Sequence, residues 1–425
     1  MALGDDTLYG IQTARAIDNF SLHYKKTSPL LIKALVMVKK AAALTYKELE
    51  EKAGGSASGN AALYRAITGA CDHILAMENI EPLFPVDALQ GGAGTSTNMN
   101  VNEALANLAL KSLGKPAGSY GIIHPIDHVN RGQSTNDVYP TALRIAAILA
   151  LRSLSEQCAK LQEALQKKEN AWSDIKKLGR TELMDAVPIT LGEEFGAYAQ
   201  ALGRDRWRLY KIEERLRQVN LGGTAVGNAD TAERRYRFLV YEKLRELTGI
   251  GLAAAEYPMD ITQNNDVFVE VSGLLKALSV NLSKIAGDIR LMNAGPSGGI
   301  GEITVQPLQM GSTIMPGKVN PVIPEMVIQA VIRVQANDFA ITTAASRGEF
   351  ELNAFLPLIA DSLLESLSLL DRTVCLFRTK CIETITPNED RCAALLDSSA
   401  AYAASLVPEL GYDEAERLVK ERKRR

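Results

Sequence analysis

The stretch NDVFVEVSGLLKALSVNLSKIAGDIRLMN, residues 265–293, indicates the fold class of this chain. Its apolar residues recur at alternating spacings of four and three, the heptad pattern of helices that pack along a shared seam. At 1.5 Å per residue such a helix would be roughly 40 Å long, a length suited to a helical bundle. The stretch therefore predicts a mainly α protein. The residues of this predicted seam are Val271, Leu275, Leu278, Leu282, Ile285, Ile289 and Met292.

Helical periodicity also dominates the rest of the chain, and the Val, Ile and Thr alternation that marks strands is scarce. Small residues such as Gly273, Ala277 and Gly287 would let neighbouring helices approach closely. Seams of this length often exceed what one chain can cover, so we expect a helical homo-oligomer, with a bundle inside one chain as the alternative. Further long helices are predicted over 138–172, 191–219, 322–346 and 355–383.

The composition of the 425 residues is that of a globular protein, with 46% hydrophobic and 23% charged residues. The net charge is −3 and both signs are mixed along the chain, so no basic face indicates nucleic acid or an anionic membrane. The apolar run AAILAL at 146–151 is too short to span a membrane. We expect a small molecule or a protein as the partner.

The cysteines and histidines argue against a disulfide-bonded protein and against a zinc protein. The five cysteines form no C-x-x-C pair and are odd in number, which argues against a disulfide framework and favours a reducing, cytoplasmic location. The four histidines show none of the spacings of a zinc site. The sequence therefore predicts no metal centre and no cofactor.

The segment GSTIMPGKVNP at 311–321 carries the first candidate chemistry. It is not a nucleotide-binding P-loop, because five residues separate its glycines and a valine follows the lysine. Pro316 and Pro321 fix the backbone on either side of Lys318 and Asn320, a cation and an amide suited to holding a carboxylate. An ordinary Gly/Pro turn between helices is the alternative.

Three further loops are rich in hydroxyl and amide side chains. Such neutral donors suit an anion whose negative charge grows during a reaction, although each loop alone is more often a helix cap or a turn. The loops are GTSTNMN with Thr95, Ser96, Thr97 and Asn98; QSTND with Ser134, Thr135, Asn136 and Asp137; and GRTELMDAVP with Thr181 and Glu182.

Taken together, these segments resemble the signatures of the fumarase/aspartase superfamily, and the resemblance covers nearly the whole chain. Within that superfamily, GGAGTSTNMN, the AVP after GRTELMD and the VIPE after NP are similar to the aspartase branch. The blocks that carry the resemblance are LYGIQTARAIDNF near the start, GGAGTSTNMNVNEALAN at 91–107, HPIDHVNRGQSTNDVYPTALRIA at 124–146, GRTELMDAVPITLGEEF at 179–195 and GSTIMPGKVNPVIPE from 311.

The resemblance implies a mainly α, three-domain fold that forms a homotetramer with a core of long helices and active sites built from three subunits. The expected domains are an N-terminal one at 1–135, the long-helix bundle at 136–388 and a small C-terminal one at 389–425. The implied reaction is anti elimination of ammonia from L-aspartate, a dicarboxylate, to give fumarate. Ser312 would be the general base that removes the C3 proton. The substrate would be bound by Thr95, Ser134, Thr135, Asn136, Thr181, Glu182, Lys318 and Asn320.

Two positions depart from the family pattern. Glu182 stands where the family has histidine or glutamine, and an ionised glutamate would repel a substrate carboxylate. Glu325 corresponds to the carboxylate that partners this histidine in fumarases, so the two glutamates could share one proton. In GNADTAERRYR at 227–237, Thr231 replaces the expected asparagine.

Two alternatives to an aspartate-specific lyase stay open. The first is a superfamily lyase for another amino- or hydroxy-dicarboxylate, including a fumarase, and the second is a non-catalytic homologue.

Overall fold

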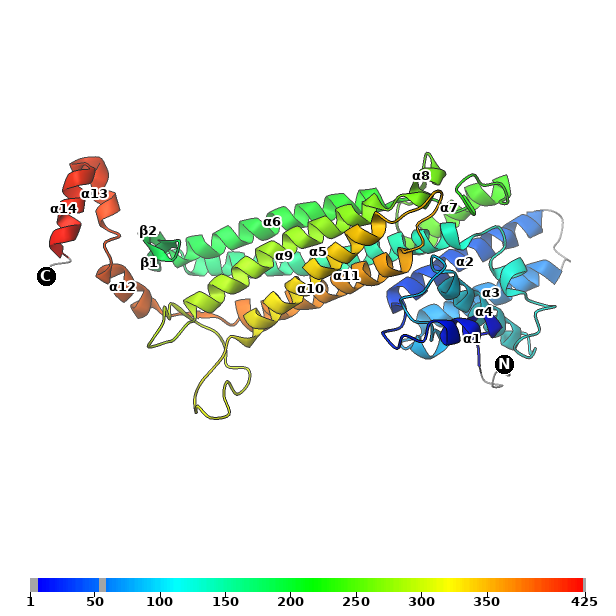
Figure 1. Ribbon diagram of the computed structural model, residues 1–425, viewed down its shortest axis with the longest axis horizontal. Coiled ribbons are helices and arrows are strands. Elements are labelled where there is room, and N and C mark those ends of the chain that lie inside the picture. Colours follow the sequence, from blue (N-terminus) through cyan, green and yellow to red (C-terminus); the bar gives the residue numbers. More distant parts are fainter. Residues whose placement is uncertain (1–6, 53–58, 423–425) are drawn as a thin grey trace. The chain divides into compact units, whose positions relative to one another are not determined.

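The structure is a computed structural model that describes residues 7–52 and 59–422 (Figure 1). Helices make up most of it, as the periodicity predicts, and the strands are few and short. The helices are α1 (Ile11–Asn19), α2 (Pro29–Lys52), α3 (Gly59–Ala76), α4 (Thr95–Ser112), α5 (Thr135–Ala171), α6 (Leu191–Leu216), α7 (Arg234–Thr248), α8 (Pro258–Gln263), α9 (Asp266–Met292), α10 (Val322–Ala345), α11 (Leu356–Phe377), α12 (Glu389–Ser398), α13 (Ala403–Leu410) and α14 (Tyr412–Arg422).

The five helices predicted from the sequence lie close to their predicted bounds, and α9 coincides with the heptad stretch to within one residue at each end. The equally long α2 was not predicted. Every residue of the predicted seam is buried, with at most 4% of its surface exposed. Burying an aliphatic side chain of this kind stabilises the fold by about 1.5–3 kcal/mol. The helix α11 ends at Phe377, before the predicted bound, because a π-helical turn at Arg378–Ile382 follows it.

The chain forms two compact units. Of the described residues, the first comprises 7–52, 59–152, 209–275 and 335–368, and the second comprises 153–208, 276–334 and 369–422. The expected domain bounds near 135 and 388 coincide with the first residues of α5 and α12, while the three-domain division itself stays a prediction.

In the first unit, α2 packs against α3 and α7, and α4 packs against α1 and α3. The buried Glu103 of α4 fixes the start of α1, because its carboxylate accepts hydrogen bonds from the backbone N–H groups of Gly10, Gln12 and Thr13 and from the Thr13 hydroxyl. Two short strands, β3 (Gln218–Val219) and β4 (Ala253–Ala254), pair in parallel.

In the second unit, segments of α5, α6, α9, α10 and α11 run alongside one another (Figure 1). An antiparallel hairpin of β1 (Lys176–Thr181) and β2 (Met184–Thr190) precedes α6, and β1 contacts α12. A second antiparallel pair joins β5 (Ile303–Thr304) to β6 (Thr386–Pro387). In the described part of the chain, no helix has both the length and the apolar character needed to cross a membrane.

Candidate active site

The predicted site residues fall into two groups, one in each unit. Thr95, Ser134, Thr135 and Asn136 belong to the first unit, and Thr181, Glu182, Ser312, Lys318, Asn320 and Glu325 belong to the second.

The first-unit group begins where a glycine turn leads into α4. Gly94 has φ 93°, and a Cβ there would lie 2.3 Å from the ring of Tyr139, so only glycine lets the start of α4 approach α5. The hydroxyl of Thr95 is exposed and donates a 2.7 Å hydrogen bond to the Gly92 carbonyl. Thr95 is thus held at the first residue of the helix by its own turn.

The loop before α5 is held to α4 by a buried amide cluster. The side-chain oxygen of Asn130 accepts hydrogen bonds from the ammonium of Lys39 at 2.7 Å and from the amides of Asn98 at 3.2 Å and Asn102 at 3.3 Å. The Asn98 amide also donates to the hydroxyl of Thr135 at 3.0 Å. Burial lowers the pKa of Lys39 to about 7. Two of the predicted hydroxyl-rich loops are therefore in direct contact.

A third loop, residues 220–225, is hydrogen-bonded to residues 134–137. The buried carboxylate of Asp137 accepts hydrogen bonds from the backbone N–H groups of Ser134, Gly222 and Thr224 at 3.0, 3.1 and 2.9 Å. The amide of Asn136 donates to the Ala225 carbonyl at 2.8 Å. Thr224 has φ 59°, a left-handed conformation that is costly for a β-branched residue. The bond from its N–H to Asp137 helps to hold it there.

Burial raises the pKa of Asp137 to about 7, and the three backbone donors and the Lys39 charge act in the opposite direction. In the sequence, Asp137 lies next to the candidate residues without an assigned role. Two of its three backbone donors, Gly222 and Thr224, lie 85 and 87 residues away along the chain, so no local motif could reveal this function.

In the second unit, Thr181 and Glu182 lie at the tip of the β1–β2 hairpin. Thr181 is the last residue of β1 and stands opposite Met184, so it ends a strand and does not cap a helix. The two turn residues, Glu182 and Leu183, have φ 54° and 64°. Such turns usually contain Asn and Gly, because other side chains are strained at positive φ. Strain held in this way is common at functional sites.

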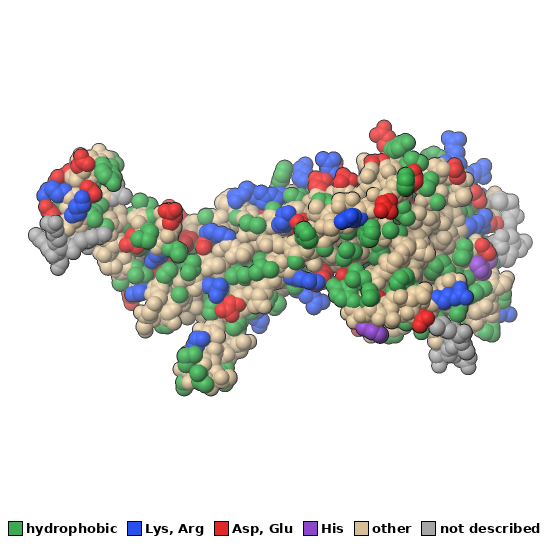
Figure 2. All heavy atoms as spheres, in the orientation of Figure 1, with side chains coloured by type: hydrophobic (Ala, Val, Ile, Leu, Met, Phe, Trp, Pro, Cys, Tyr) green, Lys and Arg blue, Asp and Glu red, His purple; other side chains and the backbone are tan. Residues whose placement is uncertain are grey.

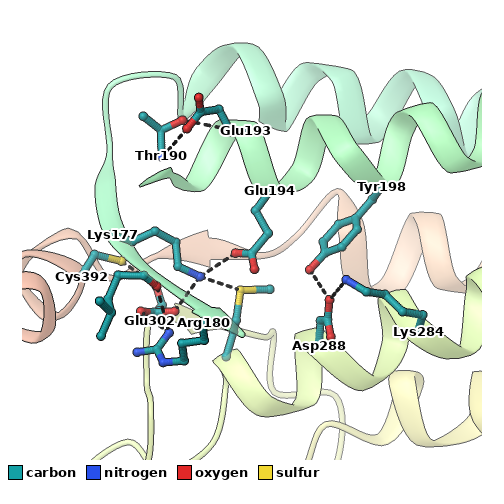
Figure 3. Close-up of polar contacts among 12 residues, drawn as sticks. Lys177, Arg180, Thr190, Glu193, Glu194, Tyr198, Lys284, Asp288, Glu302 and Cys392 are labelled. Atoms are coloured by element: carbon teal, nitrogen blue, oxygen red, sulfur yellow. Dashed lines mark hydrogen bonds and ion pairs between the residues drawn. The ribbon is translucent and has the colours of Figure 1, made fainter. Parts of the chain in front are cut away.

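A buried ion network supports this hairpin (Figure 3). The ammonium of Lys177, 2% exposed, lies 2.6 Å from a carboxylate oxygen of Glu194 and 2.8 Å from one of Glu302, which is fully buried. Arg180 contacts the other oxygen of Glu302 at 2.9 Å. Glu182 lines a cavity of about 340 Å³ together with Lys177, Arg180 and Glu194. No sequence motif pointed to this network.

The Ser312 loop is closed on itself. The Ser312 hydroxyl oxygen accepts hydrogen bonds from the backbone N–H groups of Ile314 at 3.2 Å and Met315 at 3.0 Å. The amide of Asn320 donates to the Gly311 carbonyl at 2.8 Å, and a Cβ on Gly311 would lie 2.1 Å from the carbonyl oxygen of Lys318. Ser312, Lys318 and Asn320 are therefore brought together in one loop whose closure requires glycine at 311.

The loop presents both charge and apolar surface to solvent. Lys318 is exposed, and green hydrophobic surface gathers at the tip of the loop in Figure 2. The exposed apolar side chains of this segment are Met310, Ile314, Met315 and Val319.

The two glutamates of the family comparison have different surroundings. Glu325 lies in the first turn of α10, with a carboxylate oxygen 3.9 Å from the guanidinium of Arg290. Glu182 makes no hydrogen bond or ion pair with any described residue. In the segment that departs from the family, Thr231, Arg234 and Arg235 are exposed. Across the described residues, no cluster of three or more His, Cys, Asp or Glu side chains is arranged to hold a metal ion.

A mainly α fold of long helices, with loops of hydroxyl, amide and lysine side chains, is the architecture that the resemblance implied. The chain belongs to the lyase family of the fumarase/aspartase superfamily, since residues 3–336 match the family described as "Lyase". The chain is 42% identical to the aspartate ammonia-lyase of Helicobacter pylori strain J99 over 426 residues, which cover 99% of this chain and 89% of that protein. It is 43% identical to the aspartate ammonia-lyase of Corynebacterium glutamicum, over 97% of this chain and 78% of that protein.

Solved structures of similar proteins have the same fold as this chain. A structure titled fumarate lyase:delta crystallin from Brucella melitensis, bound to cobalt, superposes with a TM-score of 0.93 at 44% identity, covering 99% of this chain and 90% of that one. The class II fumarase of Schistosoma mansoni also superposes with a TM-score of 0.93, at 29% identity and with the same coverage. The predicted fold class is thus confirmed.

Proposed function

We propose that this protein is a carbon–nitrogen lyase that eliminates ammonia from L-aspartate to give fumarate, with Ser312 as the general base. The reaction is supported by relatives named aspartate ammonia-lyase at 42–43% identity over nearly the whole chain. The observation that best supports the base is the pair of backbone N–H groups that donate to the Ser312 oxygen. Such donors stabilise an alkoxide and so lower the free-energy cost of deprotonating the serine.

The proposed step is a balanced elimination. Ser312, as the alkoxide, takes the C3 proton and becomes a hydroxyl, the C3–H electron pair forms the C2–C3 double bond, and the C2–N bond breaks with its electron pair going to nitrogen, so that the substrate ammonium leaves as ammonia. A C3 proton next to a carboxylate is very weakly acidic, because its removal adds charge to an anion. Lys318 and Asn320 offset this cost by binding that carboxylate more strongly as its charge grows.

The other carboxylate and the amino group are assigned to the hydroxyl and amide donors, namely Thr95, Ser134, Thr135, Asn136 and Thr181. The hydrogen bonds from Asn98 to Thr135 and from Asn136 to the 225 carbonyl support this assignment, because they fix the donors before substrate binds. Preorganised donors need no rearrangement in the transition state. We also propose the homotetramer with sites shared by three subunits that the resemblance implied.

Glu182 favours a second candidate, a lyase of the same superfamily with another substrate. Its carboxylate stands where the family has a donor, and it has no ionic partner among the described residues. The pairing of Glu182 with Glu325 that the resemblance implied stays a prediction, because Glu325 lies 3.9 Å from Arg290 and the Glu182 side chain has no partner among the described residues.

A substrate screen tests the proposal. Purified enzyme is incubated with L-aspartate and with related amino- and hydroxy-dicarboxylates, and the new double bond is followed by ultraviolet absorbance. The proposal requires turnover of L-aspartate. Turnover of a different dicarboxylate alone would support the second candidate, and no turnover of any member would contradict both.

A further inference from the structure

A second cavity, of about 500 Å³, lies entirely within the first unit. Its walls are the glycine-rich loop at 221–229, one face of α7, the short strand β4 and Pro258 at the start of α8. None of the predicted catalytic or substrate-binding residues lines it, although the loop that forms one wall also donates the Gly222 N–H to Asp137. Its size is within the usual range for a small-molecule site, about 300–1,000 Å³.

The charged side chains that line the cavity are all positive. Arg237 and Arg245 both line it, and none of the described residues around it is acidic. The guanidinium of Arg237 makes no hydrogen bond or ion pair with any described residue, and its Nε atom is buried without a partner. Arg245 uses its Nε to donate to the Tyr241 carbonyl at 3.2 Å, and it has no carboxylate partner in the described chain. Two guanidinium groups without a counter-charge favour an anion between them.

The walls are already formed in the unliganded chain. The Tyr241 hydroxyl donates to the Leu221 carbonyl at 2.8 Å, and the Ala229 N–H donates to the Gly223 carbonyl at 2.9 Å, which closes the loop. A Cβ on Gly222 would lie 2.9 Å from Cγ of Arg237, so glycine lets the arginine stem lie against the loop. A preformed cavity reduces the entropy lost on binding.

We propose that this cavity binds a small organic anion. A phosphate or carboxylate head is held by Arg237 and Arg245, whose planar forks match the oxygen geometry of both groups. An aromatic or other apolar body packs against Phe238, Tyr241 and Pro258, which supply the apolar part of the lining. Phe238 is 69% exposed and therefore accessible to such a ligand.

Isothermal titration calorimetry of the full-length protein tests the site, with phenyl phosphate and benzoate as the probes. We expect saturable binding of at least one probe, weakened about tenfold or more in Arg237→Met, because a charged hydrogen bond is lost. Arg245→Met, in the last turn of α7, should also weaken binding of the probe. It replaces Arg237→Met as the test variant if Arg237→Met does not fold. Preference for phenyl phosphate would identify a phosphate ligand, and preference for benzoate a carboxylate ligand.

Two variants serve as controls. Arg235→Met removes the same charge from an exposed position of α7 that does not line the cavity, and it should bind the probe as the wild type does. Lys318→Met should also bind normally, because the probe does not need the Ser312 loop. Equal affinity in the wild type and both cavity variants, loss of binding in Lys318→Met, or no saturable binding below about 10 mM would overturn the proposal.

Discussion

Asp137 shows how one buried carboxylate can hold several loops in place. It joins the N-terminus of α5 to the loop at 222–224, and Asn136 next to it makes a parallel contact with Ala225. Each such hydrogen bond contributes about 0.5–1.5 kcal/mol, and about 1.5–3 kcal/mol when the carboxylate is ionised. The position of Ser134 and Asn136 thus depends on a residue that need not touch substrate.

The raised pKa of Asp137 gives a prediction for stability against pH. Between about pH 4 and pH 7 the unfolded chain has lost this proton while the folded chain retains it, so the contribution of Asp137 to stability falls as pH rises. The slope is at most about 1.4 kcal/mol per pH unit. Asp137→Asn removes this titration, so the melting temperature of the wild type relative to the variant should fall from pH 5 to pH 7.

The matched control for Asp137→Asn is Asp185→Asn, at an exposed position of β2. Its melting temperature should follow that of the wild type across the same pH range. Parallel curves for the wild type and Asp137→Asn would show that Asp137 does not titrate in this window.

Glu182 gives a second prediction at the residue scale. Glu182→Gln keeps the shape of the side chain but supplies an amide donor. If aspartate is the substrate, the variant should retain turnover and lower the KM, because the amide can donate a hydrogen bond to a substrate carboxylate. Steady-state kinetics with L-aspartate measure this. An unchanged KM would contradict a role for Glu182 in binding the carboxylate.

The β1–β2 hairpin depends on the Lys177–Glu302 pair (Figure 3). Lys177→Met leaves the fully buried Glu302 with Arg180 as its remaining cation. Removing one partner of a buried pair typically costs about 3–5 kcal/mol, and the remaining arginine favours the lower end. Chemical denaturation should therefore show a clear loss of stability.

The control for this element is Lys284→Met. Lys284 pairs with Asp288 on the same unit but is 63% exposed, and such pairs contribute about 0–1 kcal/mol. Equal destabilisation by the two substitutions would contradict the assignment of the Lys177 pair as the support of the hairpin.

At the scale of the whole molecule, the long helices leave large apolar side chains in solvent. Trp207 and Tyr210 on α6 are 63% and 71% exposed, and Ile332 and Phe339 on α10 are 57% and 74% exposed. Large apolar side chains of this kind can be buried where subunits meet. We predict that light scattering gives four times the 46.1 kDa chain mass.

Phe339→Glu should shift this assembly to smaller species and lower activity in proportion, because the proposed sites are shared between subunits. Glu351→Gln, at an exposed polar position, should leave the mass unchanged. A fully active monomer would contradict the shared site.

The sequence predicted the long helices well, because a heptad repeat sustained over α9 leaves little ambiguity. The hairpin was missed, since residues 176–190 show no strand alternation and its turn lacks the usual Asn-Gly pair. The candidate residues were found through local clusters of hydroxyl and amide side chains and through the resemblance. The roles of Asp137 and Glu302 were not found, because each depends on contacts with residues distant in sequence. The cytoplasmic location stays a prediction.

The proposed reaction depends on the removal of a proton from L-aspartate by Ser312. The most direct test compares fumarate formation by the wild type, Ser312→Ala and Thr313→Ala, the last of which removes the neighbouring exposed hydroxyl. We expect Ser312→Ala to lower kcat by about 10²–10⁴-fold with an unchanged melting temperature and assembly, while Thr313→Ala stays close to the wild type. A Ser312→Ala enzyme that forms fumarate at the wild-type rate would contradict this role of Ser312.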